Sequence, residues 1–327
     1  MALTRDQVRA AHLALNRFGL GARPGGIRRI AADPRAALLE EMSTPRVALI
    51  AQRRLPGYVE ACQAVHTSFE AEDRIKEREL TARLAKHMEP EIGFVERLVL
   101  FFSNHFSMSI NKDGAIRATI GQLERDVIRP HVLGRFEDML LGVMEHPAMV
   151  AFLDNASSIG PNSPIGRSWG AGLNMNLARE ILELHTLGVG GGYGEGDVAA
   201  LAAIISGWSY VRGWEAQYRL NGGNRRNRGQ FIYRDDWHEP GAQSVLGRSY
   251  AQPGIRQGRA VLTDLARHPS TAQFLAFKLV RHFLTDTPTP DLVDPLAEAF
   301  RRSDGSLRAV ARALVELPQA WTLPATK

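Results

Sequence analysis

The sequence predicts a mainly α-helical protein, a single multi-helix domain over residues 1–327 with a small β-hairpin insertion. Of its 327 residues, 44% are hydrophobic, which is enough to bury a sizeable core. Apolar side chains recur every three or four residues along most of the chain, the period of a helix that packs one face inward. Strand-like alternation is confined to about residues 206–235, where we expect the hairpin.

In the first half of the chain, local signals predict a series of helices. Thr4 can cap a first helix that runs to about Phe18, and the glycine-containing stretch 19–26 ends it. Helices are then expected near residues 34–42, 57–67, 70–88, 93–106, 115–129 and 134–145.

The second half begins with a polar loop and is expected to combine helices with the hairpin. A helix is predicted over residues 173–187, and Asp197 can cap the next one, which runs to Gly207. Residues 208–220 and 229–234 flank a turn rich in Asn, Gly and Arg, so they form the predicted hairpin. Helices return from Gly254, including residues 269–283 and 292–301.

The charge pattern argues against a nucleic-acid partner, although the net charge is +5 and the pI is about 9.6. Of the 40 cationic residues 35 are Arg, and acidic residues alternate with them, as in 70–97, which is typical of solvated helices with ion pairs. One basic run, Arg225-Arg226-Asn227-Arg228, lies in a Gly/Asn-rich loop. It is either an exposed loop or a clamp for an anionic substrate.

Several other classes are excluded. No run of 18 apolar residues exists, so no membrane span is expected. The N-terminus is amphipathic and lacks the features of a secretory signal, so we expect that the protein stays in the cytoplasm, that its leader has been removed, or that it is exported with a partner. Cys62 is the lone cysteine and offers neither an internal disulfide nor a thiolate metal cluster.

No cofactor or metal motif is present in the sequence. The glycine loop 188–196 lacks the Gly-Lys-Ser/Thr ending of a phosphate loop and follows a helix. It is therefore neither a phosphate-binding loop nor a dinucleotide-binding motif. There is no His-Glu-x-x-His zinc helix and no Gly-x-Ser-x-Gly nucleophile turn. We therefore expect no cofactor.

The densest polar stretch lies between Asn155 and Tyr210, and it contains our main candidate residue. On the helix 173–187, four side chains fall within roughly 80° of one another and define the buried face: Leu173, Leu177, Ile181 and Leu184. Glu180 lies about 20° outside this face, where partial burial raises the proton affinity of a carboxylate. Glu180 is thus a candidate general acid or base.

Two neighbours of Glu180 are candidate substrate-binding groups. Glu183, three residues later, intensifies its proton affinity, and Asn176 lies just beyond the buried face. The structural alternative is that Glu183 pairs with Arg179 along the surface and that Glu180 pairs with an arginine from another helix.

Two histidines are candidate partners of Glu180. His105 points inward from the helix 93–106, and His185 lies at the opposite edge of the central helix. Each is either a catalytic partner or a core histidine satisfied by hydrogen bonds. The polar side chains of Asn104 and Ser107, and those that follow, indicate that the helix 93–106 ends near a polar cavity.

Three further positions are weaker candidates for substrate binding. Asp154 and Asn155 open the polar loop, where they position a substrate or cap the loop. His238 lies among the acidic residues of 235–241, a grouping that suits an oxygen-preferring metal but has no recognised spacing.

The central stretch also resembles a known family. Residues 174–188, followed by Gly191-Gly192-Tyr193, Asp197-Val198 and Gly207-Trp208, resemble the signature of the bacterial domain-of-unknown-function 1800 family. Residues 15–21, 103–106, 233–247 and 268–283 agree with it, so the resemblance spans nearly the whole chain. Met175 stands where the family more often has Glu. Members are frequently encoded beside an exported protein similar to alkaline phosphatases and sulfatases, which implies a partner of that kind.

From these observations we expect an acid/base enzyme of hydrolase or group-transfer type that acts on a polar substrate, such as a glycan or cell-envelope polymer. Glu180 would be the acid or base, with His105 and His185 as its partners. One alternative is a metal-binding protein that uses His105, Glu180, Glu183 and His238. Another is a non-catalytic partner or export factor for the phosphatase/sulfatase-like protein.

Overall fold

The computed structural model describes residues 3–44, 46–51, 55–64, 68–112, 114–219, 223 and 226–324. Helices make up most of this chain, and its strands form two short antiparallel sheets of two strands each. The prediction of a mainly α protein with a small hairpin is therefore confirmed. Residues 65–67 of the predicted helix 57–67, and Arg225 of the basic run, lie outside the described residues.

The first half of the chain is helical, as predicted. Its elements are α1 (Arg5–Leu13), η1 (Ala14–Phe18), α2 (Gly26–Ile30), α3 (Pro34–Ser43), α4 (Tyr58–Ala64), α5 (Phe69–His87), α6 (Phe94–His105), α7 (Gly114–Leu123), η2 (Glu124–Ile128), α8 (Arg129–His131), α9 (Phe136–Met144) and α10 (Pro147–Phe152). The segments η1 and η2 are π-helical. Thr4 caps α1 as predicted, because its Oγ1 accepts from the Gln7 N–H at 3.2 Å and its own N–H donates to Gln7 Oε1 at 3.0 Å.

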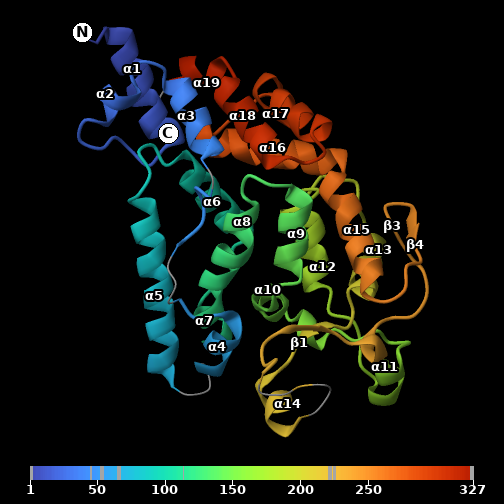
Figure 1. The fold of residues 1–327 in the computed structure, drawn as a ribbon. Coiled ribbons are helices and arrows are strands. Elements are labelled where there is room, and N and C mark those ends of the chain that lie inside the picture. Colours follow the sequence, from blue (N-terminus) through green and yellow to red (C-terminus); the bar gives the residue numbers. More distant parts are fainter. Residues whose placement is uncertain are drawn as a thin grey trace.

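The second half contains both sheets. Its elements are η3 (Asn155–Ser157), α11 (Pro164–Trp169), α12 (Asn176–Glu180), η4 (Ile181–His185), α13 (Glu195–Ile204), β1 (Trp208–Tyr210), α14 (Gly213–Tyr218), β2 (Phe231–Tyr233), η5 (Asp235–Trp237), β3 (Gln243–Val245), β4 (Arg248–Tyr250), α15 (Ile255–Arg267), α16 (Pro269–Phe283), α17 (Pro290–Arg302), α18 (Leu307–Glu316) and α19 (Gln319–Thr322). The segment η4 is π-helical. Figure 1 shows α1 and α19 at one end of the molecule and α14 at the other.

The predicted hairpin is present, but its first strand is much shorter than expected. Trp208 pairs with Tyr233, and Ser209 with Ile232, in an antiparallel register. Residues 213–218 form α14 instead of extending the strand, because the Glu215 carboxylate accepts a hydrogen bond from the Arg212 N–H at 2.8 Å and caps the helix.

The second sheet, β3 with β4, was not predicted from the sequence. Its two-residue turn places Leu246 at φ 51° and Gly247 at φ 74°, the left-handed pair that usually selects Asn-Gly. Because Leu246 stands where Asn is usual, the sequence lacks the signal that predicts this turn. The Asp197 Oδ1 accepts a hydrogen bond from the Leu246 N–H at 2.7 Å and holds this turn. The helix α13 begins three residues earlier than predicted, with Gly194 as its N-cap. Asp197 still contributes to the cap from inside the helix, because its Oδ2 accepts a hydrogen bond from the Gly194 N–H at 2.8 Å.

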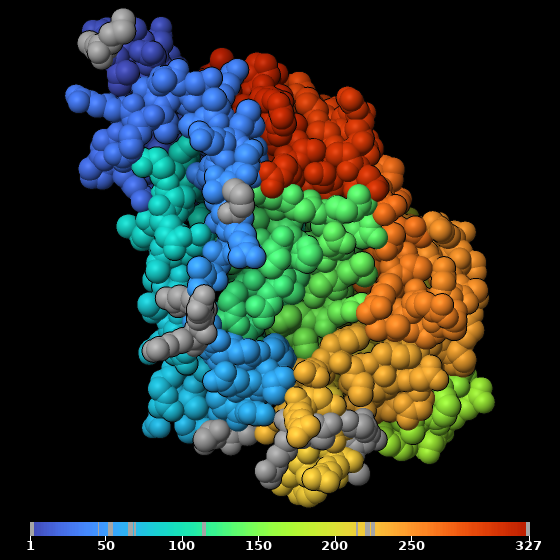
Figure 2. Space-filling view, viewed as in Figure 1, coloured from blue at the N-terminus to red at the C-terminus, as the bar shows by residue number. Residues whose placement is uncertain are grey.

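One continuous apolar core runs from Ala11 in α1 to Ala320 in α19. The Phe18 ring lies 5.7 Å from the Phe94 ring and 5.4 Å from the Trp321 ring, between centroids. In the space-filling view, N-terminal residues in blue and C-terminal residues in red meet at the same end of the molecule (Figure 2). No helix among the described residues is long and apolar enough to cross a membrane.

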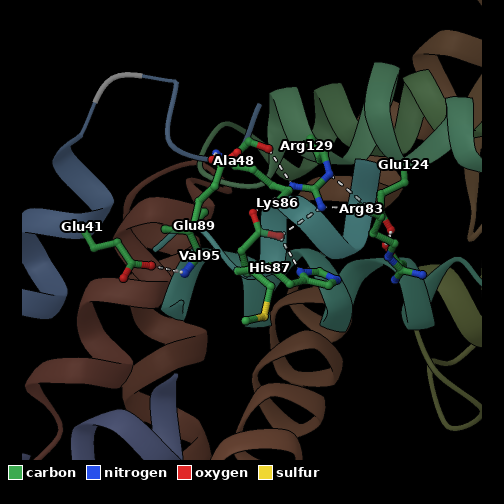
Figure 3. Close-up of polar contacts among 12 residues, drawn as sticks. Glu41, Ala48, Arg83, Lys86, His87, Glu89, Val95, Glu124 and Arg129 are labelled. Atoms are coloured by element: carbon green, nitrogen blue, oxygen red, sulfur yellow. Dashed lines mark hydrogen bonds and ion pairs between the residues drawn. The ribbon is translucent and has the colours of Figure 1, made fainter. Parts of the chain in front are cut away.

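A buried ion-pair network crosses the N-terminal half (Figure 3). The Arg129 side chain is fully buried, and its two terminal nitrogens donate to the Glu96 carboxylate at 2.9 and 3.0 Å. Its Nε donates to Glu124 Oε1 at 3.0 Å, and its Nη1 donates to the Ala48 carbonyl at 2.7 Å. The His87 Nδ1 lies 2.7 Å from Glu96 Oε2. Burial opposes ionisation of Glu96, but the hydrogen bonds from His87 and Arg129 outweigh it and lower the pKa of Glu96.

We predict that Arg129→Met lowers the free energy of unfolding by about 3–5 kcal/mol, because it leaves the Glu96 charge buried without its main partner. Urea denaturation at neutral pH measures this loss. The control is Arg312→Met in the exposed pair with Glu316, whose side chains are 63% and 50% exposed. That change should cost less than about 1 kcal/mol. Equal losses in the two variants would contradict the central role of Arg129.

Candidate functional site

The candidate site lies on the segment from α12 to the glycine loop before α13. The helix begins at Asn176, not at Leu173 as predicted. The Asn174 side chain accepts a hydrogen bond from the Asn176 N–H at 2.9 Å, and the Asn174 N–H donates to Ser158 Oγ at 3.0 Å. These bonds hold residue 174 outside the helix, because a side chain that binds a nearby backbone N–H competes with helical bonding.

The helix changes from α to π at Ile181, which alters the face that each later side chain occupies. Leu177 and Ile181 are fully buried, as predicted. Leu184 was predicted on the buried face, but this is wrong, because its side chain is 42% exposed. A π turn has i→i+5 hydrogen bonds and thus more residues per turn, so His185 takes the inward position instead and is buried.

The surface pairs around this helix also differ from the simplest expectation. Arg179 does not pair with Glu183, because its Nη1 and Nη2 donate to the two Glu195 carboxylate oxygens at 2.7 and 2.8 Å. Glu183 instead forms a side-chain hydrogen bond with Tyr193, and this bond contributes to a raised pKa of Tyr193 after the larger effects of burial and the Glu183 charge.

Glu180 is partly buried, and its carboxylate makes no hydrogen bond or ion pair within the described part of the chain. Burial raises the pKa of Glu180, and the nearby charge of Glu183 raises it further. An unpaired carboxyl group with raised proton affinity keeps its proton to higher pH than a free carboxyl group does, which is a property required of a general acid.

His105 and His185 lie together inside the protein. Their ring centroids are 5.8 Å apart, and the His105 Nε2 lies 3.1 Å from the His185 carbonyl oxygen. Lys278 of α16 places its Nζ 2.8 Å from the His105 Nδ1. These contacts fix His105 as the neutral tautomer that donates from Nε2 and accepts at Nδ1.

Burial sets the protonation of this cluster. It lowers the pKa of His185 to about 3 and that of Lys278 to about 8, with the Lys278 charge adding to the effect on His185. Burial, followed by the charges of Lys278 and His185, also lowers the pKa of His105 well below its ordinary value. Both imidazoles are therefore neutral at pH 7, and Lys278 is the group in the cluster that titrates closest to physiological pH.

Lys278 was not identified from the sequence. It is the one lysine in the otherwise apolar run 274–280 of α16, four residues after Phe274 and therefore on the same side of the helix. A single cation in such a run was the signal available. Its partner was not visible, because His105 lies 173 residues away along the chain.

Asp154 and Asn155 have different surroundings. Asp154 adopts a left-handed conformation at φ 58°, and its half-exposed carboxylate pairs with Lys112 at 2.6 Å. Asn155 is fully buried, and its Nδ2 donates to the carbonyls of Ile205 at 3.1 Å and Trp208 at 2.9 Å. The Asn155 side chain thus ties the loop to the end of α13.

Asn176 and His238 lie at separate places. Asn176 is exposed at the start of α12. His238 is partly buried, with its Nδ1 3.2 Å from the Ser206 carbonyl and its ring 5.5 Å from that of Tyr233. No hydrogen bond, ion pair or ring contact in the described chain joins Glu180 to His105, His185 or His238. The described residues also contain no group of three or more His, Cys, Asp or Glu side chains that could hold a metal ion.

A cavity of about 730 Å³ lies outside the glycine loop, between Gly188–Gly190 and the α16 residues Phe274 and Phe277. Phe274 separates it from the histidine cluster, because its ring lies 6.3 Å from the His105 ring and 5.2 Å from the Lys278 Nζ. Gly188 has φ +80°, and an added Cβ would lie 2.8 Å from Phe274 Cδ2. Only glycine lets the loop pack this closely against α16.

The fold and these sites define a mainly α-helical protein with a buried histidine–lysine cluster beneath a glycine loop. The chain belongs to the family described as a protein of unknown function (DUF1800), whose model matches residues 13–327. No curated protein and no solved structure matches the chain.

We predict that the stability difference between the wild type and Lys278→Met depends on pH. The pKa of Lys278 falls from 10.5 to about 8 on folding, so the folded protein releases this proton before the unfolded chain does. Between about pH 8 and pH 10.5 the unfolded chain binds this proton more strongly than the folded protein does, so the free energy of unfolding rises with pH in this range. Above about pH 10.5 Lys278 is neutral in both states and the cost of burying its charge is gone. Urea denaturation of both proteins should show that, as pH rises from about 7 to about 10.5, the free energy of unfolding of the wild type increases relative to that of the variant.

NMR titration of the Lys278 Nζ provides the control, with an expected midpoint near pH 8. A stability difference that stays constant across this range, together with a midpoint above pH 10, would contradict the buried geometry of Lys278.

Proposed function

We propose that the protein is an acid/base enzyme of hydrolase or group-transfer type, in which the Glu180 carboxyl group donates or accepts the proton. The observation that supports this proposal is the state of Glu180. It is a partly buried carboxyl group with a raised pKa, beside Glu183, and it lacks a hydrogen-bond or ion-pair partner in the described residues. Carboxylates with structural roles in this protein, such as Glu96 and Glu41, are instead fully occupied by donors.

The groups near Glu180 support a polar substrate. Asn176 is exposed one turn earlier in α12, Glu183 follows Glu180 by three residues, and Tyr193 interacts with Glu183. Amide, carboxylate and phenol groups together donate and accept hydrogen bonds, as a hydroxyl-rich molecule requires. A glycan or another cell-envelope polymer is the substrate class we propose.

In this proposal, His105 and His185 are positioning residues. His185 belongs to the π turn that directly follows Glu180, and its carbonyl is held by the His105 Nε2 at 3.1 Å. Lys278 holds the other nitrogen of His105 at 2.8 Å. This chain of contacts fixes the end of the helix that carries Glu180, and rigid support of this kind keeps a reactive group in place.

The test is to incubate the protein with purified cell-envelope glycans and to measure the release of reducing ends over a range of pH. We expect Glu180→Gln to lower turnover by at least about 100-fold, because it keeps the shape of the side chain and removes its proton. If Glu180 acts as the acid, wild-type activity falls as pH rises through its raised pKa. Glu183→Gln removes the charge that raises this pKa further, so the fall in activity should occur at lower pH in this variant.

Glu195→Gln is the matched control, since Glu195 lies on the same surface but pairs with Arg179. Its turnover and pH profile should match the wild type. Glu180→Gln should also melt at or above the wild-type temperature at pH 7, because it removes a partly buried charge. An active Glu180→Gln variant, or one that is strongly destabilised, would show that the role of Glu180 is structural.

A second candidate function, a non-catalytic partner or export factor for a phosphatase/sulfatase-like protein, is supported by exposed apolar side chains at the 730 Å³ cavity. Val189 is 77% exposed and Phe277 is 39% exposed at its rim. Exposed apolar side chains around a hollow suit a protein contact. We predict that co-expression yields a stable complex, which Val189→Asp disrupts and the control Val8→Asp on α1 does not. Failure of the wild type to form the complex would remove this candidate.

A further inference from the structure

A second cavity, independent of Glu180, lies where α6 ends. Its volume is about 520 Å³, and its walls come from α5, α6, α7, η2 and the loop after His105. The sequence predicted a polar cavity at this place, and Ser103, Asn104 and Ser107 do line it. Most of its lining is nevertheless apolar: Leu100, Phe106, Met108, Ile120, Leu123 and Ile128. A volume of this size with a mainly apolar lining suits a small organic ligand, and the polar and charged side chains of the wall decide which ligand fits.

The acidic groups of this cavity are paired with arginines that do not line it. The Glu124 Oε1 accepts from Arg129 at 3.0 Å, and its Oε2 accepts from Ser103 Oγ at 2.9 Å. Glu79 is paired with Arg125. Neither Arg129 nor Arg125 belongs to the lining, so these carboxylates present little net negative charge to the cavity.

Arg83 is a cationic group of the cavity wall that has unused hydrogen-bond donors. Arg83, which is partly exposed, approaches Glu124 Oε2 through its Nε at 2.9 Å, as Figure 3 shows. No hydrogen bond within the described chain uses its two terminal nitrogens. The side chains of Asn104 and Ser107 likewise make no hydrogen bond to the described residues. Lys76 and Arg117 also line the wall, and each is ion-paired, Lys76 with Asp73 at 2.6 Å and Arg117 with Glu72 at 3.5 Å.

We propose that this cavity binds a small amphipathic carboxylate, with its apolar chain against Phe106, Met108 and Ile120 and its carboxylate on Arg83. The planar guanidinium suits a carboxylate because two parallel N–H groups can donate to its two oxygens. Asn104 and Ser107, which also line the cavity, supply further donors. Large apolar side chains at the opening, Leu80 at 48% exposure and Ile110 at 40%, extend the contact surface for the chain.

The test is calorimetric titration of the full chain with decanoate below its micelle concentration. Decanol is the probe without charge, and acetate is the probe without an apolar chain. We expect one saturable decanoate site per protein and weaker binding of both other probes. Arg83→Gln should weaken decanoate binding by about 10-fold, the effect of one charge-assisted hydrogen bond, and leave decanol binding unchanged.

Two further variants make the test specific. Ser107 is exposed at the cavity wall, so Ser107→Trp can fill the cavity without disturbing the core and should abolish binding of decanoate and decanol. Arg74→Gln, at an exposed position of α5 outside the cavity, is the matched control and should bind decanoate like the wild type. The proposal would be overturned if decanoate showed no saturable binding to the wild type. It would also be overturned if Arg83→Gln and Ser107→Trp both bound decanoate as tightly as the wild type does.

Discussion

The contact between Arg129 and Glu96 is the constraint on which much of the structure depends. Arg129 follows η2, and its guanidinium reaches α6 through Glu96, η2 through Glu124 and the segment before α4 through the Ala48 carbonyl. Taking two charges out of water is costly, so their geometry must be satisfied almost completely. The network therefore specifies one orientation of α6 against η2. That orientation in turn places His105 and the 520 Å³ cavity at the end of α6.

The π-helical segments η1, η2 and η4 share a structural role. Each directly follows an α-helix, and each directs a polar side chain to a partner that an uninterrupted α-helix would not present in the same way. Arg17 in η1 binds backbone carbonyls, Glu124 in η2 binds Arg129 and Ser103, and His185 in η4 packs against His105. π turns are rare and occur frequently at functional sites. In this protein they supply polar contacts at three separate places in the fold.

The sequence predicted local features better than contacts. Thr4 as a cap and the inward orientation of His105 depend on neighbouring residues alone, and both are confirmed. Leu184 was misplaced because constant rotation per residue does not hold through a π turn. The β3–β4 turn was missed because Leu246, not Asn, takes a left-handed conformation that Asp197 stabilises from another element. Lys278 was missed because its role depends on a partner that only the folded chain brings near.

Arg17 has a consequence for how the chain folds during synthesis. Its guanidinium donates to the carbonyls of Ala320 at 2.6 Å, Leu323 at 3.1 Å and Pro324 at 2.6 Å, across sequence separations of 303, 306 and 307 residues. Contacts of such long range form late, since closing a long loop must precede any gain from the contact. While the ribosome is still making the later helices, the buried surface of η1 lacks its partner and stays open to other apolar surfaces. The early helices of a nascent chain therefore need protection from association until residues 320–324 emerge.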